Sequence, residues 1–246
     1  MRLTVIGCAG SAPGPLSPAS CYLVQHEEFS LLLDLGNGSF GALQTVLDPA
    51  EVDAVYLSHL HADHCLDTAP FMVWHRYSGR SDGRPVPLYA PMGADRRLAM
   101  AYDAGGGPVD DVFDVTPIGP GSWRLGPFSV TTARTAHPVE CYAVRLTVGG
   151  RSLVYTGDTG PSPAVVELAR GADVLLAEAA YAEGPDLPPG LHLTGRQAGE
   201  HAAAAGVGRL LVTHVPSWID ADAQLAAARS VFPASELARH AAVYDI

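Results

Sequence analysis

The sequence predicts a four-layer αββα sandwich, in which two β-sheets pack together and helices cover both outer faces. Short strand-like apolar runs recur along all 246 residues, helical patterns separate them, and no linker, repeat or heptad series interrupts the chain. An apolar content of 48% is enough for a substantial core, so residues 1–246 are expected to form one domain. Layered packing is the stable arrangement for such a mixture of strands and helices.

The elements can be placed along the chain from their apolar patterns. Strands are predicted over residues 3–6, 22–25, 30–34, 54–57, 87–89, 128–132, 142–147, 153–155, 174–177 and 209–213. Helices are predicted over residues 40–47, 65–76, 163–170, 195–205 and 220–231. The early strands are expected to form hairpins, and the later strands to alternate with helices. Twenty prolines and 26 glycines in short loops agree with many brief elements.

The charge of the chain argues against long nucleic acid as a partner. The formal net charge is −11, and all fifteen basic residues are dispersed arginines, with no lysine. Counterion-driven binding of DNA or RNA requires a basic face. A small anionic nucleotide remains an acceptable ligand, because bound divalent metal ions would locally reverse the sign of the field.

The sequence also indicates in which cellular compartment the protein is expected. No apolar run approaches the roughly 18 residues of a membrane span, and the apolar part of residues 1–7 is too short for a signal peptide. The four cysteines lack CxxC spacing; they are Cys8, Cys21, Cys65 and Cys141. We therefore expect a cytoplasmic protein that has no membrane association and keeps its thiols reduced.

The most informative segment is the HxHxDH motif, Ser58-His59-Leu60-His61-Ala62-Asp63-His64. Four strong metal ligands within six residues have few other uses, and their spacing suits two neighbouring ions. Two divalent ions about 3.5 to 4 Å apart can share a water molecule as nucleophile, which indicates hydrolysis. The apolar run before the motif predicts a buried strand, so the ligands are expected on the loop at its C-terminal end.

Further ligands follow other predicted strands. His137 comes after the strand at 128–132, Asp158 after 153–155 and His214 after 209–213. Each residue alone has an ordinary alternative, as a helix-capping Asp or a hydrogen-bonded core His. Their shared position after strands, together with the motif, predicts one dinuclear metal site.

These residues resemble the motifs of the metallo-β-lactamase superfamily along nearly the whole chain. The matching segments are Leu33-Asp34-Leu35-Gly36, His59 to His64, His137, Tyr155-Thr156-Gly157-Asp158-Thr159-Gly160 and Thr213-His214. The resemblance implies that one ion binds His59, His61 and His137. It further implies that a second ion binds Asp63, His64 and His214. Asp158 would bridge both ions, and Asp34 would orient the ligand loop.

Comparison within the superfamily narrows the expected activity. True metallo-β-lactamases carry a cysteine at the position of Asp158, and the di-iron oxygen-reducing members carry a glutamate at that of His61, so neither branch fits. The segments 175–179, 191–199 and 211–214 resemble the phosphodiester-cleaving branch that includes ribonuclease Z. By this resemblance, Glu178 and His192 form a pair that protonates the leaving oxygen. A capping position before Thr194 is the alternative for His192.

Two features separate the chain from ribonuclease Z itself. That enzyme carries a long arm that grips transfer RNA, usually between its third and fourth motifs, whereas the interval from His137 to Asp158 leaves no room for one. The segments 7–20, 57–67, 74–77 and 213–218 are more similar to an actinobacterial group of cyclic-nucleotide phosphodiesterases. This resemblance implies hydrolysis of 3′,5′-cyclic nucleotides, such as cyclic AMP, to 5′-monophosphates by metal-bound hydroxide, with Asp63 holding and deprotonating the water.

Other functions stay open at this point. They are a ribonuclease Z-like endoribonuclease without the arm, a hydrolase of another phosphodiester, ester, thioester or lactone, and a non-enzymatic metal-dependent binding role. Zinc is the expected metal for both positions, with manganese or iron as alternatives. Homodimers are common among relatives, so a homodimer is expected.

Several aromatic and basic residues are weaker candidates for the substrate site. Trp74, Tyr77 and Trp218 are candidates for stacking on a nucleobase, and Arg76 for meeting a phosphate. Core packing is the ordinary alternative for Trp74. For Arg76 it is an exposed position at a helix end.

Overall fold

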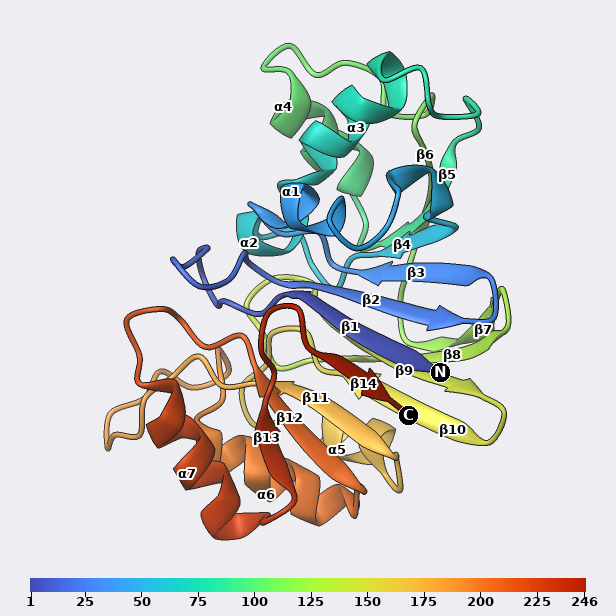
Figure 1. Ribbon diagram of the computed structural model, residues 1–246. Coiled ribbons are helices and arrows are strands. Elements are labelled where there is room, and N and C mark those ends of the chain that lie inside the picture. Colours follow the sequence, from blue (N-terminus) through green and yellow to red (C-terminus); the bar gives the residue numbers. More distant parts are fainter.

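The computed structural model describes residues 1–246 and arranges them in two seven-stranded sheets that pack face to face (Figure 1). In spatial order, the first sheet contains β14 (Val243–Asp245), β1 (Arg2–Gly7), β2 (Cys21–His26), β3 (Phe29–Leu33), β4 (Ala54–Tyr56), β5 (Val86–Ala90) and β6 (Phe113–Pro117). The second contains β13 (Ser235–Leu237), β12 (Arg209–Thr213), β11 (Val174–Glu178), β10 (Arg151–Tyr155), β9 (Tyr142–Val148), β8 (Phe128–Arg134) and β7 (Gly121–Leu125).

Helices cover the outer face of each sheet (Figure 1). The first sheet carries α1 (Ser39–Leu43), α2 (Ala62–Cys65), α3 (Thr68–Tyr77) and α4 (Ala94–Tyr102), and a short 3₁₀ turn, η1 (Pro49–Glu51), precedes β4. The second sheet carries α5 (Pro163–Ala169), α6 (Gly195–Ala205) and α7 (Ala221–Val231). The predicted four-layer αββα sandwich is thus confirmed. None of these helices has both the length and the apolar character that a membrane-spanning helix needs.

Each sheet has an antiparallel half and a parallel half. Strands β1, β2 and β3 pair antiparallel, and β3 to β6 pair parallel. Likewise β7 to β10 pair antiparallel, and β10 to β13 parallel. The expected early hairpins are confirmed for β1 to β3, and the expected late alternation of strands and helices is confirmed for β10 to β13. The middle of the chain has both patterns, because β4 to β6 alternate with helices and β7 to β10 form hairpins. Parallel pairing needs a crossover connection, and the helices supply most of these.

The apolar side chains of a strand divide between two layers of core. In β3, Leu31 and Leu33 belong to the buried cluster between the sheets, whereas Leu32 packs beneath the helices of the first sheet. Successive side chains of a strand point to opposite faces, so a continuous apolar run indicates burial on both sides. For this reason the predicted strand at residues 30–34 contains three consecutive leucines and shows no alternation of apolar and polar residues.

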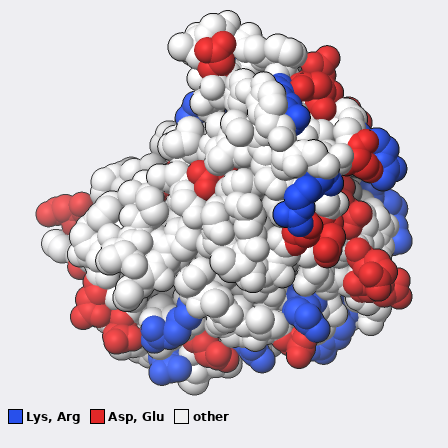
Figure 2. All heavy atoms as spheres, turned by 45° about the horizontal axis from the view of Figure 1, so that its top comes forward, with Lys and Arg blue, Asp and Glu red and all other residues white.

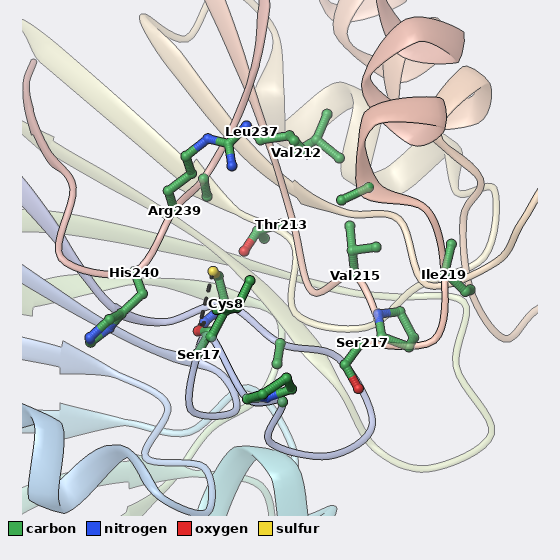
Figure 3. Close-up of a pocket in the computed structure, with 17 residues that line it drawn as sticks. Cys8, Ser17, Val212, Thr213, Val215, Ser217, Ile219, Leu237, Arg239 and His240 are labelled. Atoms are coloured by element: carbon green, nitrogen blue, oxygen red, sulfur yellow. Dashed lines mark hydrogen bonds between the residues drawn. The ribbon is translucent and has the colours of Figure 1, made fainter.

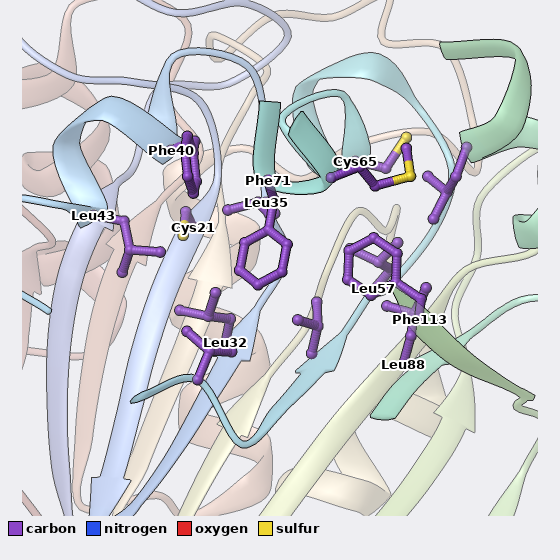
Figure 4. Close-up of a cluster of buried hydrophobic side chains, with 14 of the residues drawn as sticks. Cys21, Leu32, Leu35, Phe40, Leu43, Leu57, Cys65, Phe71, Leu88 and Phe113 are labelled. Carbon is purple, nitrogen blue, oxygen red and sulfur yellow. The ribbon is translucent and has the colours of Figure 1, made fainter. Parts of the chain in front are cut away.

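The core under the first helical layer is mainly aliphatic and contains three phenylalanine rings (Figure 4). The Phe71 ring stacks on Phe113 with centroids 5.5 Å apart and meets Phe40 nearly edge-on at 5.8 Å. Phe40 comes from α1, Phe71 from α3 and Phe113 from β6. These contacts fix α1 and α3 on the sheet, and α2 lies between them in the chain.

Some elements escaped prediction from the sequence. The strands β6, β7, β13 and β14 and the helix α4 were not predicted. Strands β6, β7, β13 and β14 lie at sheet edges, and their burial is partial, so their sequences lack a clear apolar pattern. Helix α4 buries only Ala94 and Leu98, which leaves a weak signal.

The predicted helix at 65–76 is α3, which begins later than predicted, at Thr68, and a separate short helix, α2, ends at Cys65. The Asp67 backbone N–H donates to the Leu35 carbonyl, and its carboxylate accepts from the Phe40 N–H at 2.8 Å. These bonds tie the residues between α2 and α3 to the loop that follows β3 and to the first turn of α1. Tertiary hydrogen bonds of this kind are not visible in helical periodicity.

Helix α6 shows why some boundaries were predicted correctly. Thr194 and Gln197 form a capping box at its start, and Gly206 ends it in the left-handed conformation with φ of 63°. These local signals gave the predicted range 195–205, which is confirmed.

Candidate metal centre

The predicted ligands come together at one edge of the sandwich. His59 and His61 follow β4, and Asp63 and His64 lie in α2. The loops after β8, β10 and β12 supply the other ligands, which are His137, Asp158 and His214. All these side chains converge in two groups, and in each the donor atoms lie within 4.8 Å of one another.

The first group contains His59, His61, His137 and Asp158. His59 Nε2 is 3.0 Å from His61 Nδ1 and 3.6 Å from Asp158 Oδ2. His137 Nε2 is 3.4 Å from His61 Nδ1. Three imidazole nitrogens and a carboxylate oxygen thus surround a common point, as in a tetrahedral zinc site.

The second group contains Asp63, His64, His214 and again Asp158. His214 Nε2 is 3.0 Å from Asp63 Oδ2 and 3.1 Å from His64 Nε2. Asp158 Oδ1 lies 3.1 Å from His64 Nε2, while its other oxygen faces the first group. Asp158 is therefore the one residue shared by both groups, the position expected for a bridging carboxylate.

Asp34 orients residues of both groups although it belongs to neither. Its Oδ2 accepts from His64 Nδ1 at 2.7 Å and from the Ser58 hydroxyl at 2.8 Å, and its Oδ1 accepts from the Ser58 N–H. Ser58 Oγ in turn lies 3.1 Å from His59 Nδ1. Donation from each Nδ1 leaves the Nε2 lone pairs of His59 and His64 facing the ligand groups.

Two further residues support the ligands through contacts that were not predicted from the sequence. Tyr155 donates its hydroxyl to Asp34 Oδ2 at 2.6 Å, and His137 Nδ1 lies 3.0 Å from the Leu191 carbonyl. Ser58 adjoins the metal motif, so its position is a signal that the sequence offered. Tyr155 reads as an ordinary apolar residue of β10 and carries no such signal.

Burial keeps most of the histidines neutral. It lowers the pKa of His59, His61 and His137 below the usual value, and only a neutral imidazole can bind a metal. For His64, burial also acts to lower the pKa, but the charges of Asp158 and Asp34 outweigh it and raise the pKa well above the usual value. The carboxylates therefore favour positive charge at this point, which a divalent cation would supply in place of a proton.

The donor set fits two divalent metal ions. Asp158 is buried and its Oδ1 has no hydrogen-bond donor, even though His64 and His214 present ring nitrogens to it at 3.1 and 3.4 Å. A buried carboxylate oxygen without a donor is rare in proteins, and a cation between these atoms would satisfy it. Imidazole and carboxylate together are ligands that zinc, manganese and iron all accept.

Glu178 and His192 form a hydrogen-bonded pair beside the two groups. Glu178 ends β11 and is fully buried, and its Oε1 lies 2.9 Å from His192 Nδ1. Backbone N–H groups of Thr159, Ala180 and Leu193 hold the same carboxylate. His192 Nδ1 is 3.9 Å from Asp158 Oδ2, and its ring is partly open to solvent. The pair therefore places an imidazole at the mouth of the candidate metal centre.

The weaker candidates from the sequence have different surroundings. Trp74 packs against the outer core and its ring is 6.3 Å from that of Phe71, so it has a packing position. Tyr77 and Trp218 are 73% and 67% exposed. Arg76 lies in the last turn of α3, as expected of a cation at a helix end, but its side chain is only 14% exposed, and its guanidinium makes two bonds of 2.6 and 2.7 Å to the Asp111 carboxylate.

A separate cavity of about 410 Å³ lies beside the centre, between the loop that follows β1 and the loop that follows β12 (Figure 3). Cys8 and Ser17 line one side, and Thr213 and Val215 line the other. None of the metal-ligand candidates lines it, although Thr213 and Val215 flank His214. The cavity shows that these two loops face each other next to the second ligand group.

Relatives of this chain were found by sequence. A family model described as the beta-lactamase superfamily domain matches residues 31–215. An uncharacterized protein of Mycobacterium leprae is 46% identical over 240 residues, which covers 94% of this chain and 84% of the relative. The probable metallo-hydrolase YhfI of Bacillus subtilis is 32% identical over 238 residues, with 94% of each chain covered. Ribonuclease BN of Escherichia coli is 28% identical over 307 aligned positions that span both chains.

Solved structures with a similar fold were also found. The crystal structure of YhfI has a TM-score of 0.89 at 30% identity and covers 99% of this chain and 98% of its own. A diphosphatase from the PhnP family has a TM-score of 0.77 at 20% identity, covering 100% and 97%, so that likeness is one of fold. The fold and the two donor groups define a metallo-hydrolase that binds divalent metal ions. The chain belongs to the beta-lactamase superfamily.

Proposed function

We propose that this protein is a phosphodiesterase that hydrolyses 3′,5′-cyclic nucleotides, such as cyclic AMP, to 5′-monophosphates. The observation that carries the proposal is the Glu178–His192 pair, which holds a proton-donating imidazole beside Asp158, the residue common to both ligand groups. Hydrolysis of a phosphodiester expels an alkoxide, which must gain a proton as it departs. A thioester expels a thiolate, which is less basic than an alkoxide, so its hydrolysis makes a weaker demand for such a donor.

Two bound divalent ions would supply a nucleophilic water and neutralise the charge of the phosphoryl oxygens. Asp63 lies at the edge of the second ligand group, and His214 and His64 hold its carboxylate. Burial acts to raise the pKa of Asp63, but the neighbouring His214 and His64 outweigh it, so its pKa lies well below the usual value. Asp63 is therefore anionic, and it is suited to accept a hydrogen bond from the attacking water and hold it in place.

His192 provides the proton for the leaving O3′ atom. In the protonated imidazolium, Nδ1–H donates to Glu178 and Nε2–H is the proton that is free for transfer. Burial acts to lower the pKa of His192, but the hydrogen bond and the charge of Glu178 outweigh this effect and raise it. An imidazolium stabilised in this way is a suitable donor near neutral pH.

Two observations favour a small substrate over a long RNA. The chain between His137 and Asp158 is taken up by the hairpin of β9 and β10, so it holds no extended arm. Nine of the fifteen arginines form ion pairs with carboxylates: Arg76, Arg80, Arg84, Arg134, Arg151, Arg170, Arg196, Arg209 and Arg239. On the face drawn in Figure 2, arginines and carboxylates are intermixed, mostly at the right and along the lower edge, and uncharged side chains cover most of the rest. Such a surface offers no basic track for a phosphate backbone.

A ribonuclease activity on RNA 3′ ends is the second candidate. It is favoured by the full-length similarity to ribonuclease BN. If it holds, the purified protein should bind structured RNA tightly, and the affinity should fall steeply as salt rises. Weak RNA binding that changes little with salt would favour the small-substrate proposal.

We further propose zinc as the metal of both sites and a homodimer as the assembled form. Histidine-rich ligation with one bridging carboxylate suits zinc. Metal analysis of protein purified without added metal tests the first point, and sedimentation equilibrium tests the second.

The proposed activity is tested by chromatography of the products formed from 3′,5′-cyclic AMP by metal-loaded protein. We expect adenosine 5′-monophosphate, and none from His61→Ala, which loses a ligand of the first group. Appearance of the 3′-monophosphate would show that the other ester bond is cut and would contradict the role given to His192. No product from fully metallated protein would reject the cyclic-nucleotide proposal.

A further inference from the structure

We propose that the backbone N–H of Ser11 donates a hydrogen bond to a phosphoryl oxygen of the substrate at the metal centre. No side chain of Ser11 is required, so the residue type gives no sequence signal for this role. The inference rests on the proposed function, because it takes the ligand of the centre to be a phosphoryl group.

The Ser11 N–H points at the second ligand group. Its nitrogen lies 3.4 Å from His214 Nε2, the same ring nitrogen that faces Asp63 at 3.0 Å and His64 at 3.1 Å. The structure gives this N–H no other acceptor. A backbone donor is therefore directed at the point where the metal-binding atoms meet.

Metal binding removes the acceptor of this N–H. The Nε2 lone pair of His214 is the pair that a metal would use, and it cannot serve both a metal and a hydrogen bond. A backbone N–H without an acceptor is unfavourable unless another group takes its place. The Ser11 side chain is exposed, so this N–H stands where the centre opens to solvent and a ligand oxygen can reach it. Anionic phosphoryl oxygens are strong acceptors for such donors.

The backbone around Ser11 is held in an uncommon conformation. Ser11 has φ of 61°, and the Ala12 N–H donates to the Gly10 carbonyl at 2.7 Å, which closes a γ-turn around it. A γ-turn with positive φ at a residue other than glycine is rare and strained. Such strain persists only where the surroundings impose it, and it is concentrated at functional sites.

The surroundings that impose this conformation are visible in the structure. Ala9 forms bridges with Ala19 and with Val215, the residue after His214. A Cβ atom on Gly10 would lie 2.3 Å from the His214 carbonyl oxygen, so only glycine lets the loop approach this closely. Figure 3 shows the two loops facing each other across the neighbouring cavity. The loop that carries Ser11 is therefore braced against the loop that carries His214.

The same loop has no charged side chain to bind a phosphate. Residues 9–20 contain only alanine, glycine, serine, proline and leucine. A phosphoryl group approaching from this side therefore meets a fixed backbone dipole instead of a flexible cation.

The inference is tested by removing the N–H without changing the side chain. An amide-to-ester variant with lactate at position 11 is compared with Ser11→Ala, which has the same side chain and keeps the N–H. Both are loaded with zinc, checked for equal metal content, and titrated with inorganic phosphate in a calorimeter. We expect phosphate to bind the ester variant at least about tenfold more weakly, because the lost bond has a charged acceptor. Equal dissociation constants, or no phosphate binding by the wild-type protein, would overturn the inference.

A second measurement reads the same N–H directly. In zinc-loaded protein labelled with ¹⁵N-serine, the Ser11 amide proton should move downfield when phosphate is added, and Ser11→Ala identifies its resonance. An unmoved resonance while phosphate binds would also overturn the inference. Failure of the proposed function is distinguishable, since absence of cyclic AMP hydrolysis together with Ser11-dependent phosphate binding would reject only the phosphodiesterase activity.

Discussion

The carboxylate of Asp34 accepts the Nδ1 hydrogen of His64 at 2.7 Å, and this contact decides which ring nitrogen of His64 faces the second ligand group. The same carboxylate accepts the hydroxyl of Ser58, which stands 3.1 Å from His59 Nδ1. One buried anion therefore orients a histidine of each group. Asp34, which directly follows β3, is thereby linked to both candidate metal positions.

Replacing Asp34 by Asn should weaken metal binding by about 10- to 100-fold, because an amide provides less charge for the Nδ1–H donors. Competition with a chromophoric chelator measures this affinity. Asp48→Asn is the matched control, since Asp48 caps the turn η1 and belongs to neither ligand group. Equal affinities in both variants would show that Asp34 does not orient the ligands.

His192→Gln should lower kcat for cyclic AMP by about 10²- to 10⁴-fold, because it removes the proton donor for O3′. Its metal content should equal that of the wild type, as His192 lies outside the two ligand groups that share Asp158. Steady-state kinetics and elemental analysis together check this. His26→Gln, at the end of β2, serves as the control. Full activity of His192→Gln would reject the assignment.

Glu178→Gln should shift the alkaline side of the pH profile. Burial acts to lower the pKa of His192, but Glu178 outweighs it, so the pKa is raised in the native protein. The donor must be protonated, hence kcat should hold below this pKa and fall as pH rises through it. Loss of the carboxylate charge lowers the pKa, so the fall should begin at lower pH in the variant. Superimposable profiles of kcat against pH would contradict the role of the pair.

Gly36→Ala should destabilise the α2 ligand segment. A Cβ at this position would lie 1.9 Å from the Asp63 carbonyl oxygen, whereas one at Gly41 would meet nothing within 4 Å. We expect Gly36→Ala to lose about 1–3 kcal/mol of unfolding free energy together with bound metal. Gly41→Ala, in helix α1, should be neutral or slightly more stable. Denaturant titration measures the unfolding free energy of each variant. Equal unfolding free energies of the two variants would contradict the close approach of residue 36 to the Asp63 carbonyl.

Removing the ions should lower the melting temperature. At a metal concentration 1,000-fold above the dissociation constant, binding contributes about 4 kcal/mol per site, which corresponds to roughly 10 °C for a chain of this length. Without metal, Asp63 and Asp158 are left as buried carboxylates in close proximity to one another. Calorimetric scans with chelator, and after zinc is restored, give the shift. An unchanged melting temperature would argue against ligation by these residues.

The sequence by itself determined the fold class and the set of candidate ligands. Both depend on local information: apolar runs mark the strands, and the donor residues follow directly after them, as His214 follows β12. The capping residue Thr194 and the terminal Gly206 likewise define α6 within a short window. Signals of this kind lie within a few residues of one another, so one sequence is enough to show them.

Only the tertiary structure decided the contacts between distant segments. Tyr155 reaches Asp34 across 121 positions of the chain, and the Ser11 N–H meets His214 across 203. The edge strand β14 is defined by its pairing with β1 and by little in its own sequence. In each case the determining interaction is a hydrogen bond between segments that lie far apart in the chain, and a backbone N–H or a shared carboxylate has no residue pattern that reveals its partner beforehand.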